Sequence, residues 1–230
     1  MSGNRRPTDD PLIDKIRRAA ARSIEAPGTA RRPLPKETPR PGANFIVAFR
    51  HGESEDNRDR VFSGWRDSPL TELGCEQARA LAPQLARLPL NLVITSDLAR
   101  SKETARLALL PHANLTWEED RRIKERDYGD LAGQSKRAWM EKDPERTSLW
   151  RRGYDVAPPN GESLKMVEQR VWPFLDELVQ RIRRKKINIV LSLHGNSMRA
   201  VRRYFEHLSL EETLTHESPL GSDYALYVVR

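Results

Sequence analysis

Two histidine–glycine pairs stand out because each closely follows a short apolar run. His51 comes just after the run 45–49, and His194 comes directly after the run 187–193. A neutral imidazole can attack phosphorus or a carbonyl, and it can exchange protons near neutral pH. A single histidine is more often a structural residue. Two histidines in matched contexts instead indicate one shared reaction site.

Basic residues that lie near expected turns suggest what this site binds. They are Arg50, Arg100, Lys136, Arg151 and Arg152. Guanidinium groups bind phosphate and carboxylate through paired hydrogen bonds, and the first turn of a helix adds free N–H donors. Taken one at a time, each of these residues would be read as a solvated surface cation. Taken together, they predict an oxyanion ligand.

The pattern of apolar residues predicts the elements that carry these side chains. Buried strands are expected at 45–49, 90–95, 187–193 and 224–229. Helices are expected from the cap Thr71 to Leu88, from the cap Ser96 to Leu110, and over 164–182. Strands alternating with helices indicate an α/β fold with a parallel sheet, in which ligands bind beyond the carboxyl ends of the strands. The two histidines are therefore expected to converge there.

The first 43 residues read as an extension ahead of a catalytic domain at 44–230. They hold seven of the 16 prolines, and the stretch 26–42 has the character of a linker. Before it, Asp10 is a candidate cap for a short amphipathic helix that starts at Pro11. We expect this helix to dock on the core or to fray, and its role is open.

Charge and composition limit the classes of partner. Of the net charge of +7, most lies in residues 1–43, which hold 10 Lys and Arg against 5 Asp and Glu, whereas residues 44–230 hold 30 against 28. We expect no nucleic-acid partner and no membrane partner, and we expect a cytoplasmic protein, since no signal peptide or long apolar run is present. Cys75, the single cysteine, is expected to be a buried thiol without a disulfide or a metal.

Seven segments of the sequence resemble segments of a known protein family. The runs are RHGESEDN (50–57), FSGWRDSPLTELG (62–74), TSDLARSKETA (95–105), ERDYGDLAG (125–133), WRRGYD (150–155), ESL (162–164) and SLHGNSMRA (192–200). Together they closely resemble the cofactor-dependent phosphoglycerate mutases of the histidine phosphatase superfamily, over residues 44–229. The RHG triplet alone indicates only the superfamily, whereas the segments around 125–133, Lys136 and 150–152 are typical of mutases. The resemblance implies a three-layer α/β/α fold with a mostly parallel sheet.

The resemblance also implies a role for each matching residue. His51 would be the nucleophile that becomes phosphohistidine, and His194 its partner in stabilising charge. Glu125 would be the general acid and base; the alternative is that Glu125 only forms an ion pair with Arg126. The catalytic set would be His51, Glu125, His194, Arg50 and Arg100. The substrate-binding set would be Arg50, Ser54, Asn57, Ser63, Gly64, Arg100, Glu125, Tyr128, Lys136, Arg151, Arg152, Gly195 and Asn196.

The function that the resemblance implies is interconversion of 3-phosphoglycerate and 2-phosphoglycerate, an isomerase reaction of glycolysis and gluconeogenesis. It implies 2,3-bisphosphoglycerate as the cofactor that primes His51, no metal, and a monomer or dimer. A histidine phosphatase that hydrolyses small phosphate esters is the nearest alternative. A binding protein that uses its basic N-terminus is a third interpretation, against which the complete catalytic set argues.

Three features depart from the family pattern. Only seven residues, 155–161, separate Tyr154 from Glu162, where many members have a longer insertion. The chain ends directly after the last expected strand, and Asp56 stands where an aromatic residue is usual. We therefore expect a site that is more open to water, in which a phosphohistidine would hydrolyse more readily.

Overall fold

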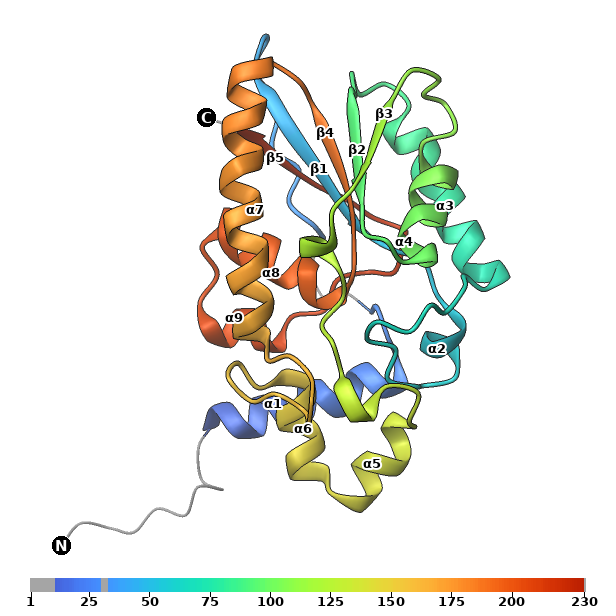
Figure 1. The fold of residues 1–230 in the computed structure, drawn as a ribbon, viewed down its shortest axis with the longest axis vertical. Helices are drawn as coiled ribbons and strands as arrows, with labels where there is room; N and C mark the ends of the chain where they lie inside the picture. Colours follow the sequence, from blue (N-terminus) through green and yellow to red (C-terminus); the bar gives the residue numbers. More distant parts are fainter. Residues whose placement is uncertain (1–10, 30–32, 230) are drawn as a thin grey trace, which may run out of the picture.

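The computed structural model describes residues 11–29 and 33–229, and its centre is a five-stranded sheet (Figure 1). The strand order is β3-β2-β4-β1-β5. Four strands are parallel, and β5 runs antiparallel to β1. The strands are β1 (Asn44–Arg50), β2 (Leu92–Thr95), β3 (Thr116–Glu119), β4 (Ile189–Leu193) and β5 (Ala225–Val229). The expected α/β class with a mostly parallel sheet is confirmed.

The four predicted strands are present, but one strand was missed. β3 has the sequence TWEE, and most of its residues are exposed because it lies at the sheet edge. It therefore carries no apolar run that would reveal it. The predicted starts at 90 and 187 are each two residues early.

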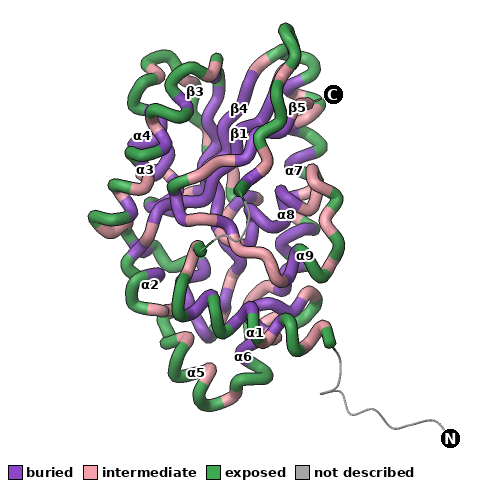
Figure 2. The backbone as a smooth tube through the Cα atoms, turned by 180° about the vertical axis from the view of Figure 1, so that it is seen from behind, coloured by how far each residue is buried: buried purple, intermediate pink, exposed green. Residues whose placement is uncertain are grey.

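Helices cover both faces of the sheet, and alternate residues of β1 point to opposite sides. Ile46 and Ala48 belong to one apolar cluster, which includes residues of α7 (Leu164–Lys185) and α8 (Gly195–Glu206). Phe45, Val47 and Phe49 belong to another, which includes residues of α3 (Glu72–Leu85) and α4 (Ala99–Ala108). Figure 2 shows these strands as the buried centre of the molecule. The three-layer arrangement is therefore confirmed.

The expected helix starts are right for one helix and wrong for another. Thr71 caps α3, with its side chain accepting the Gly74 N–H. Ser96, in contrast, does not cap α4, whose N-cap is Leu98. Ser96 Oγ accepts the Leu98 N–H instead, and it also contacts His194. This tertiary contact fixes Ser96 ahead of the helix rather than at its start.

A group of short elements lies beyond the carboxyl ends of the parallel strands (Figure 1). It comprises α2 (Glu55–Arg58), the 3₁₀ helices η2 (Arg121–Ile123) and η3 (Gly129–Leu131), α5 (Lys136–Lys142), α6 (Pro144–Arg152), α9 (Leu210–Thr215) and α1 (Pro11–Glu25). α1 packs on α6, α9 and α5. These elements build the walls around the site.

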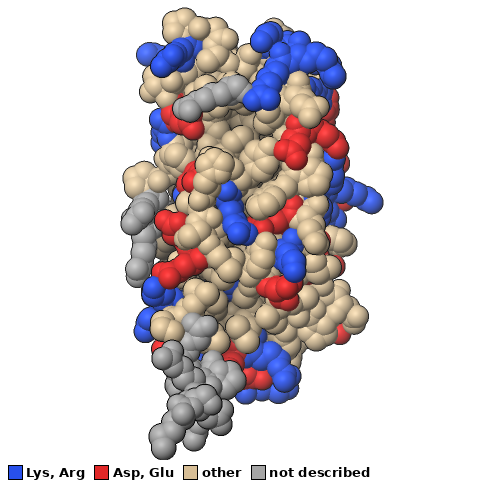
Figure 3. Space-filling model, turned by 90° about the vertical axis from the view of Figure 1, so that its left-hand side faces the viewer, with Lys and Arg blue, Asp and Glu red and all other residues tan. Residues whose placement is uncertain are grey.

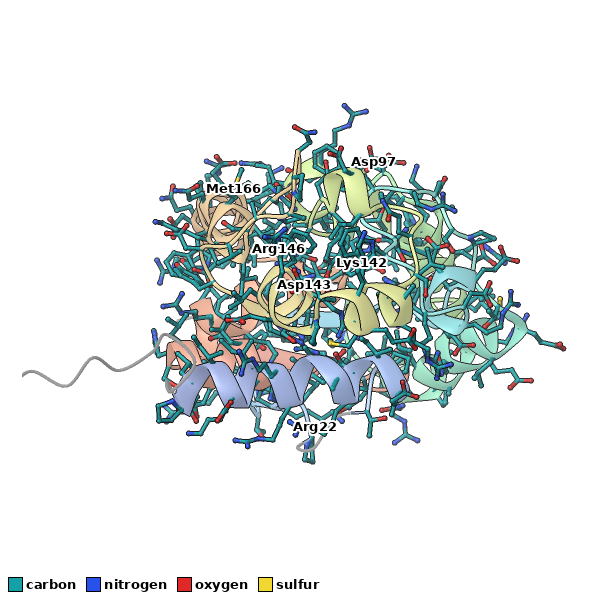
Figure 4. The ribbon with its side chains drawn as sticks, turned by 90° about the horizontal axis from the view of Figure 1, so that it is seen from below. Arg22, Asp97, Lys142, Asp143, Arg146 and Met166 are labelled. Carbon is teal, nitrogen blue, oxygen red and sulfur yellow. The ribbon has the colours of Figure 1, made fainter. Side chains whose placement is uncertain are left out.

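α1 occupies the residues in which an amphipathic helix was predicted, and its apolar face is buried. Ile16 is part of the main apolar cluster, and Ala19, Ala20 and Ile24 are also buried. Figure 4 shows α1 along one side of the molecule, with Arg22 pointing away from it. The proposed cap Asp10 lies outside the described residues. α1 is therefore a packed part of the described structure.

Part of the stretch predicted to be a linker forms backbone hydrogen bonds with the sheet. Glu37 N donates to Leu226 O at 3.1 Å, and Leu226 N donates to Pro35 O at 2.8 Å. These bonds occupy backbone groups of β5, the strand at the sheet edge. The prolines that suggested a linker thus also protect an open strand edge.

Three further features concern membrane-spanning helices, the distribution of charge and the burial of Cys75. None of the helices in the described part of the chain combines the length and apolar character needed to cross a membrane. On the face shown in Figure 3, acidic and basic side chains are interspersed. Cys75 is free but only partly buried, so the expectation of a buried thiol was wrong.

Candidate active site

His51 and His194 lie side by side because the strands that precede them are neighbours. β1 and β4 pair in parallel, with Arg50 opposite Leu193. The His51 N–H donates to Leu193 O at 2.9 Å. The two ring centroids are 5.1 Å apart. The expected convergence is confirmed, at the point of the sheet where the chain leaves β1 and β4.

Contacts of His51 define which ring nitrogen is free to react. Its Nδ1 lies 2.7 Å from Gly52 O. A carbonyl oxygen only accepts hydrogen bonds, so Nδ1 must carry the proton, and Nε2 keeps its lone pair. Burial, and then the charges of Arg100 and Arg50, hold the pKa of His51 well below its usual value. His51 is therefore a neutral imidazole with a free Nε2, which is the form that a nucleophile requires.

His194 is held by a neighbour that the sequence did not identify. Its Nε2 lies 2.7 Å from Ser96 Oγ. Burial, followed by the charges of Arg100 and His51, lowers the pKa of His194. Its Nδ1 is buried and has no hydrogen-bond partner among the described residues. The Ser96 hydroxyl can donate its proton to Nε2, in which tautomer Nδ1 carries the ring proton and is a free donor.

Arg100 lies on the first turn of α4 and is almost fully buried, with 1% exposure. Its Nη2 donates to Gly64 O and its Nη1 to Arg66 O, both at 2.8 Å. Gly64 has a φ of +53°, and a Cβ there would come within 2.9 Å of Tyr128 N. Only glycine fits this position. The segment around Gly64 thus fixes the guanidinium of Arg100.

Glu125 lies against the turn that follows His194. Its Oε2 accepts the Gly195 N–H at 2.9 Å, and its Oε1 accepts the Asn196 N–H at 3.0 Å. Burial raises the pKa of Glu125, but hydrogen bonds from the Arg126 N–H and the Asn196 side chain, with the charges of Arg50 and Arg100, outweigh burial and lower it. Glu125 is therefore an ionised carboxylate at neutral pH.

The alternative of an ion pair between Glu125 and Arg126 is wrong. Glu125 accepts only the backbone N–H of Arg126, at 2.7 Å. The guanidinium of Arg126 donates instead to Tyr128 Oη at 2.9 Å and to Arg151 O at 3.0 Å. Glu125 is thus directed to Gly195 and Asn196 in the first turn of α8, two residues of the predicted substrate-binding set.

Glu217 was missed by the sequence analysis, although it holds three arginines. It accepts from Arg50 Nη1 at 2.9 Å, from Arg199 Nη2 at 3.0 Å, and from Arg152. Burial raises its pKa, but the charges of Arg152 and Arg50 reverse this and lower the pKa to about 2. No sequence motif marks Glu217, whereas Arg199 belongs to the 192–200 run that carries the family resemblance.

A buried cation, Arg151, and a partly buried one, Lys136, lie where no acid neutralises them. Among the described residues, no carboxylate contacts Lys136 or Arg151 within ion-pair distance. Burial, and then the charges of Arg151 and Arg50, lower the pKa of Lys136 to about 7. Burying cations without a partner is costly, so this end of the site is suited to an anionic ligand.

A small pocket of about 60 Å³ joins most of these side chains. Of the residues predicted from the sequence, it is lined by Arg50, Asn57, Ser63, Glu125, Tyr128, Lys136, Arg151, Arg152, Gly195 and Asn196. The other predicted site residues, His51, Ser54, Gly64, Arg100 and His194, do not line it. The N–H of Ser54 donates to Asn57 Oδ1 at 3.3 Å, which orients Asn57. Ser23, Pro27, Arg199 and Glu217 line it as well and were not predicted.

Arg50, which lines this pocket, and Arg100 and His194, which do not line it, carry nitrogens that are suited to a phosphoryl group. Nε of Arg50, Nε of Arg100 and Nδ1 of His194 are buried and have no hydrogen-bond partner among the described residues. Such fixed donors can stabilise the negative charge on the oxygens of a transferring phosphoryl group. The described residues contain no cluster of three or more His, Cys, Asp or Glu that could hold a metal ion.

Comparisons of sequence agree with this geometry. The family model of the histidine phosphatase superfamily (branch 1) matches residues 46–228. A 2,3-bisphosphoglycerate-dependent phosphoglycerate mutase from Parvibaculum lavamentivorans is 40% identical over 185 residues, which cover 78% of this chain and 88% of that protein. A protein of the same name from Brucella melitensis is 40% identical over 184 residues, covering 76% and 88%.

Solved structures with a similar fold include phosphatases. A mycobacterial glucosyl-3-phosphoglycerate phosphatase in complex with VO₃ has a TM-score of 0.70 and 27% identity, covering 80% of this chain and 92% of that one. The α-ribazole phosphatase from Shigella flexneri has a TM-score of 0.68 and 27% identity, covering 80% and 95%. The fold is therefore common to mutases and phosphatases.

Proposed function

Because the chain belongs to branch 1 of the histidine phosphatase superfamily, in the family of the 2,3-bisphosphoglycerate-dependent phosphoglycerate mutases, we propose that it interconverts 3-phosphoglycerate and 2-phosphoglycerate through phosphohistidine at His51. The observation that carries the proposal is the neutral His51, whose Nε2 is free and whose ring lies beside His194. Bisphosphoglycerate supplies the phosphoryl group that first charges His51.

The chemical step uses the free Nε2 of His51. As the bond from Nε2 to phosphorus forms, the bond from phosphorus to the ester oxygen breaks. Negative charge on the phosphoryl oxygens is stabilised by the unpartnered nitrogens of Arg50, Arg100 and His194. Imidazole is a good leaving group in the reverse direction, so the same donors serve both transfers.

Glu125 accepts the proton of the substrate hydroxyl and later returns it. In the transfer from phosphohistidine to a monophosphoglycerate, the ionised Glu125 accepts the proton of the attacking hydroxyl as the new oxygen–phosphorus bond forms. In the following transfer back to His51, the protonated Glu125 returns that proton to the oxygen that leaves. The low pKa of Glu125 favours the first of these roles in the resting enzyme.

Lys136, Arg151 and Arg152 favour a mutase over a phosphatase. These cations line the same pocket as Glu125, so they can bind the carboxylate of the acid while a phosphate lies at His51. Holding the acid in place lets its second hydroxyl approach the phosphohistidine before water does. With this reaction we propose a role in glycolysis and gluconeogenesis, and a cytoplasmic location.

A histidine phosphatase remains the second candidate function. It is favoured by the phosphatases among the solved structures of similar fold. His51, His194, Arg50 and Arg100 would act in the same way, and water would replace the substrate hydroxyl as acceptor of the phosphoryl group.

The two functions are separated by measuring mutase and phosphatase rates side by side, with and without 2,3-bisphosphoglycerate. The mutase predicts interconversion that exceeds hydrolysis and that depends on priming by bisphosphoglycerate. Labelled bisphosphoglycerate should leave an acid-labile phosphoryl group on His51, and His51→Ala should abolish both label and turnover. Release of inorganic phosphate faster than interconversion would establish the phosphatase, and label persisting in His51→Ala would exclude His51 as the nucleophile.

A further inference from the structure

The C-terminal turn of α1 lies against the end of the pocket formed by Lys136 and Arg151. Ser23 and Pro27 from this part of the chain line the pocket directly. We propose that residues 20–27, the wall segment, belong to the substrate-binding site, where they orient Arg151 and limit the substrate to small phosphorylated acids. The proposal rests on the phosphoryl-transfer function proposed above.

The wall segment holds Arg151 through two buried acceptors. Arg151 Nη1 donates to Ala20 O, and Nη2 donates to Ser23 Oγ at 3.0 Å. Ser23 Oγ in turn donates to Ala20 O at 3.1 Å. Because both Nη atoms are engaged, α1 fixes the orientation of Arg151.

This orientation matters because Arg151 has no acid beside it. Burial, and then the charge of Arg152, lower the pKa of Arg151 to about 10. Its Nε is buried and without a partner among the described residues. A ligand anion that neutralises Arg151 and Lys136 would therefore lie next to the wall segment.

The size of the pocket sets the size of that ligand. The pocket volume of about 60 Å³ holds roughly four to six water molecules, because one water molecule needs about 10 to 15 Å³ of cavity volume. In the liquid, each of these molecules occupies about 30 Å³. Because His51 does not line this pocket, the space suits the part of a small phosphorylated acid that lies beyond the transferring phosphoryl group. We expect the wall segment to leave little room there for a hexose attached to that acid.

A much larger space lies on the other side of the wall segment. A cleft of about 1300 Å³ is lined by Ile24, Glu25, Arg137 and His216, and it shares Ser23, Arg152 and Glu217 with the pocket. The segment is thus a partition between the two spaces. Displacing it would connect them and admit a bulkier ester.

One buried side chain and two polar contacts keep the wall segment in position. Ile24 is buried, with 2% exposure. Glu25 pairs with Arg137 at 2.7 Å, and Glu25 O accepts from Arg60 Nη2 at 3.1 Å. Replacing Ile24 by a charged residue should release the segment, because an unpaired charge is costly to bury.

The first test compares hydrolysis of 3-phosphoglycerate with hydrolysis of glucosyl-3-phosphoglycerate, a substrate pair that differs by one hexose. In the full-length protein, Ile24→Asp should lower the ratio of kcat/KM for the small ester over the large one by at least tenfold. Arg18→Asp, at an exposed position of the same helix, should leave the ratio unchanged. Thermal unfolding and His51 labelling establish that the variant is folded. An unchanged ratio in a folded Ile24→Asp variant would overturn the proposal.

The second test changes only the side chain of Ser23 and leaves the wall segment folded. Ser23→Ala removes one acceptor of Arg151 and should raise KM for 3-phosphoglycerate about tenfold, with kcat changed less than about threefold, whereas Ser23→Thr should restore KM. Equal KM values in Ser23→Ala and the parent would refute the orientation of Arg151 by α1. The first test measures hydrolysis alone, so it examines the partition whether or not the protein is a mutase. Absence of mutase activity would refute the proposed function only.

Discussion

Glu125 Oε1 accepts both the backbone N–H and the side-chain NH₂ of Asn196, at 3.0 and 2.9 Å. These two residues are 71 positions apart, and their contact places an ionised carboxylate on the turn that follows His194. The turn thereby links Glu125, the proposed general acid and base, to His194, the histidine proposed to stabilise the phosphoryl group.

Glu125→Gln should lower mutase turnover by roughly a hundredfold to ten-thousandfold, because an amide cannot accept the proton of the attacking hydroxyl. Hydrolysis of p-nitrophenyl phosphate should fall much less, since its leaving group needs no proton. Steady-state rates of both reactions are the measurement. An equal loss of both activities would mean that Glu125 acts on the fold of the site rather than on the proton.

Substrate affinity should depend on pH through Lys136. The pKa of Lys136 is lowered to about 7, so its positive charge is present below pH 7 and is lost as pH rises above it. KM for 3-phosphoglycerate should therefore rise between pH 6 and pH 8.5, and Lys136→Arg should remove much of this rise. Lys142→Arg, at an exposed position of the same helix, is the control. A pH profile that is identical in the Lys136→Arg variant would assign the rise to another group.

Acid should not inactivate the nucleophile in the usual range for histidine. The pKa of His51 is held well below its ordinary value, so His51 stays neutral as pH falls from 7.5 to 6. The rate of His51 phosphorylation by bisphosphoglycerate, measured by rapid quenching, should change less than about threefold over this range. A decline that follows an ordinary histidine titration would contradict the neutral state of His51.

Arg151→Ala and Arg152→Ala should separate transfer from recognition. Loss of one charge-assisted contact costs about 1.5 to 3 kcal/mol, or roughly ten- to a hundredfold in a rate or equilibrium. Mutase kcat/KM should drop by that factor, while hydrolysis of p-nitrophenyl phosphate should change only a few-fold. Arg50→Ala should reduce both activities strongly. If the Arg151 and Arg152 variants depressed both activities equally, the recognition role would be wrong.

Glu217→Gln should destabilise the protein in a pH-dependent way. The pKa of Glu217 is lowered to about 2 in the folded state, against about 4.3 in an unfolded chain. The stabilisation is therefore complete above pH 4.3 and lost as pH falls toward 2, and it is worth about 3 kcal/mol.

Urea unfolding at pH 7 and pH 3 measures this contribution. The difference in free energy of unfolding between the parent and Glu217→Gln should be large at pH 7 and smaller at pH 3. Glu76→Gln, at an exposed position, should show little difference at either pH. A difference that does not shrink in acid would mean that the carboxylate charge of Glu217 does not hold Arg50, Arg152 and Arg199.

The sequence alone was sufficient for four of the five strands of the sheet, all but the exposed edge strand β3, and for the place of the two histidines. Buried strands such as β1 and β4 are continuous apolar runs. Thr71 caps α3 through a contact with a residue only three positions further along the chain. These signals are local, so they can be read along the chain. The meeting of His51 and His194 followed from the general rule that parallel strands present their carboxyl ends at one edge.

Only the tertiary structure decided which side chains hold these residues in place. Ser96 had the sequence context of a helix cap, yet it contacts His194, 98 positions away. Glu217 carries no motif, yet it holds Arg50 from a distance of 167 positions. Ser23 orients Arg151 across 128 positions. Hydrogen bonds of this kind depend on the packing of whole elements, α1 against α6 above all, and no local pattern of residue types encodes them.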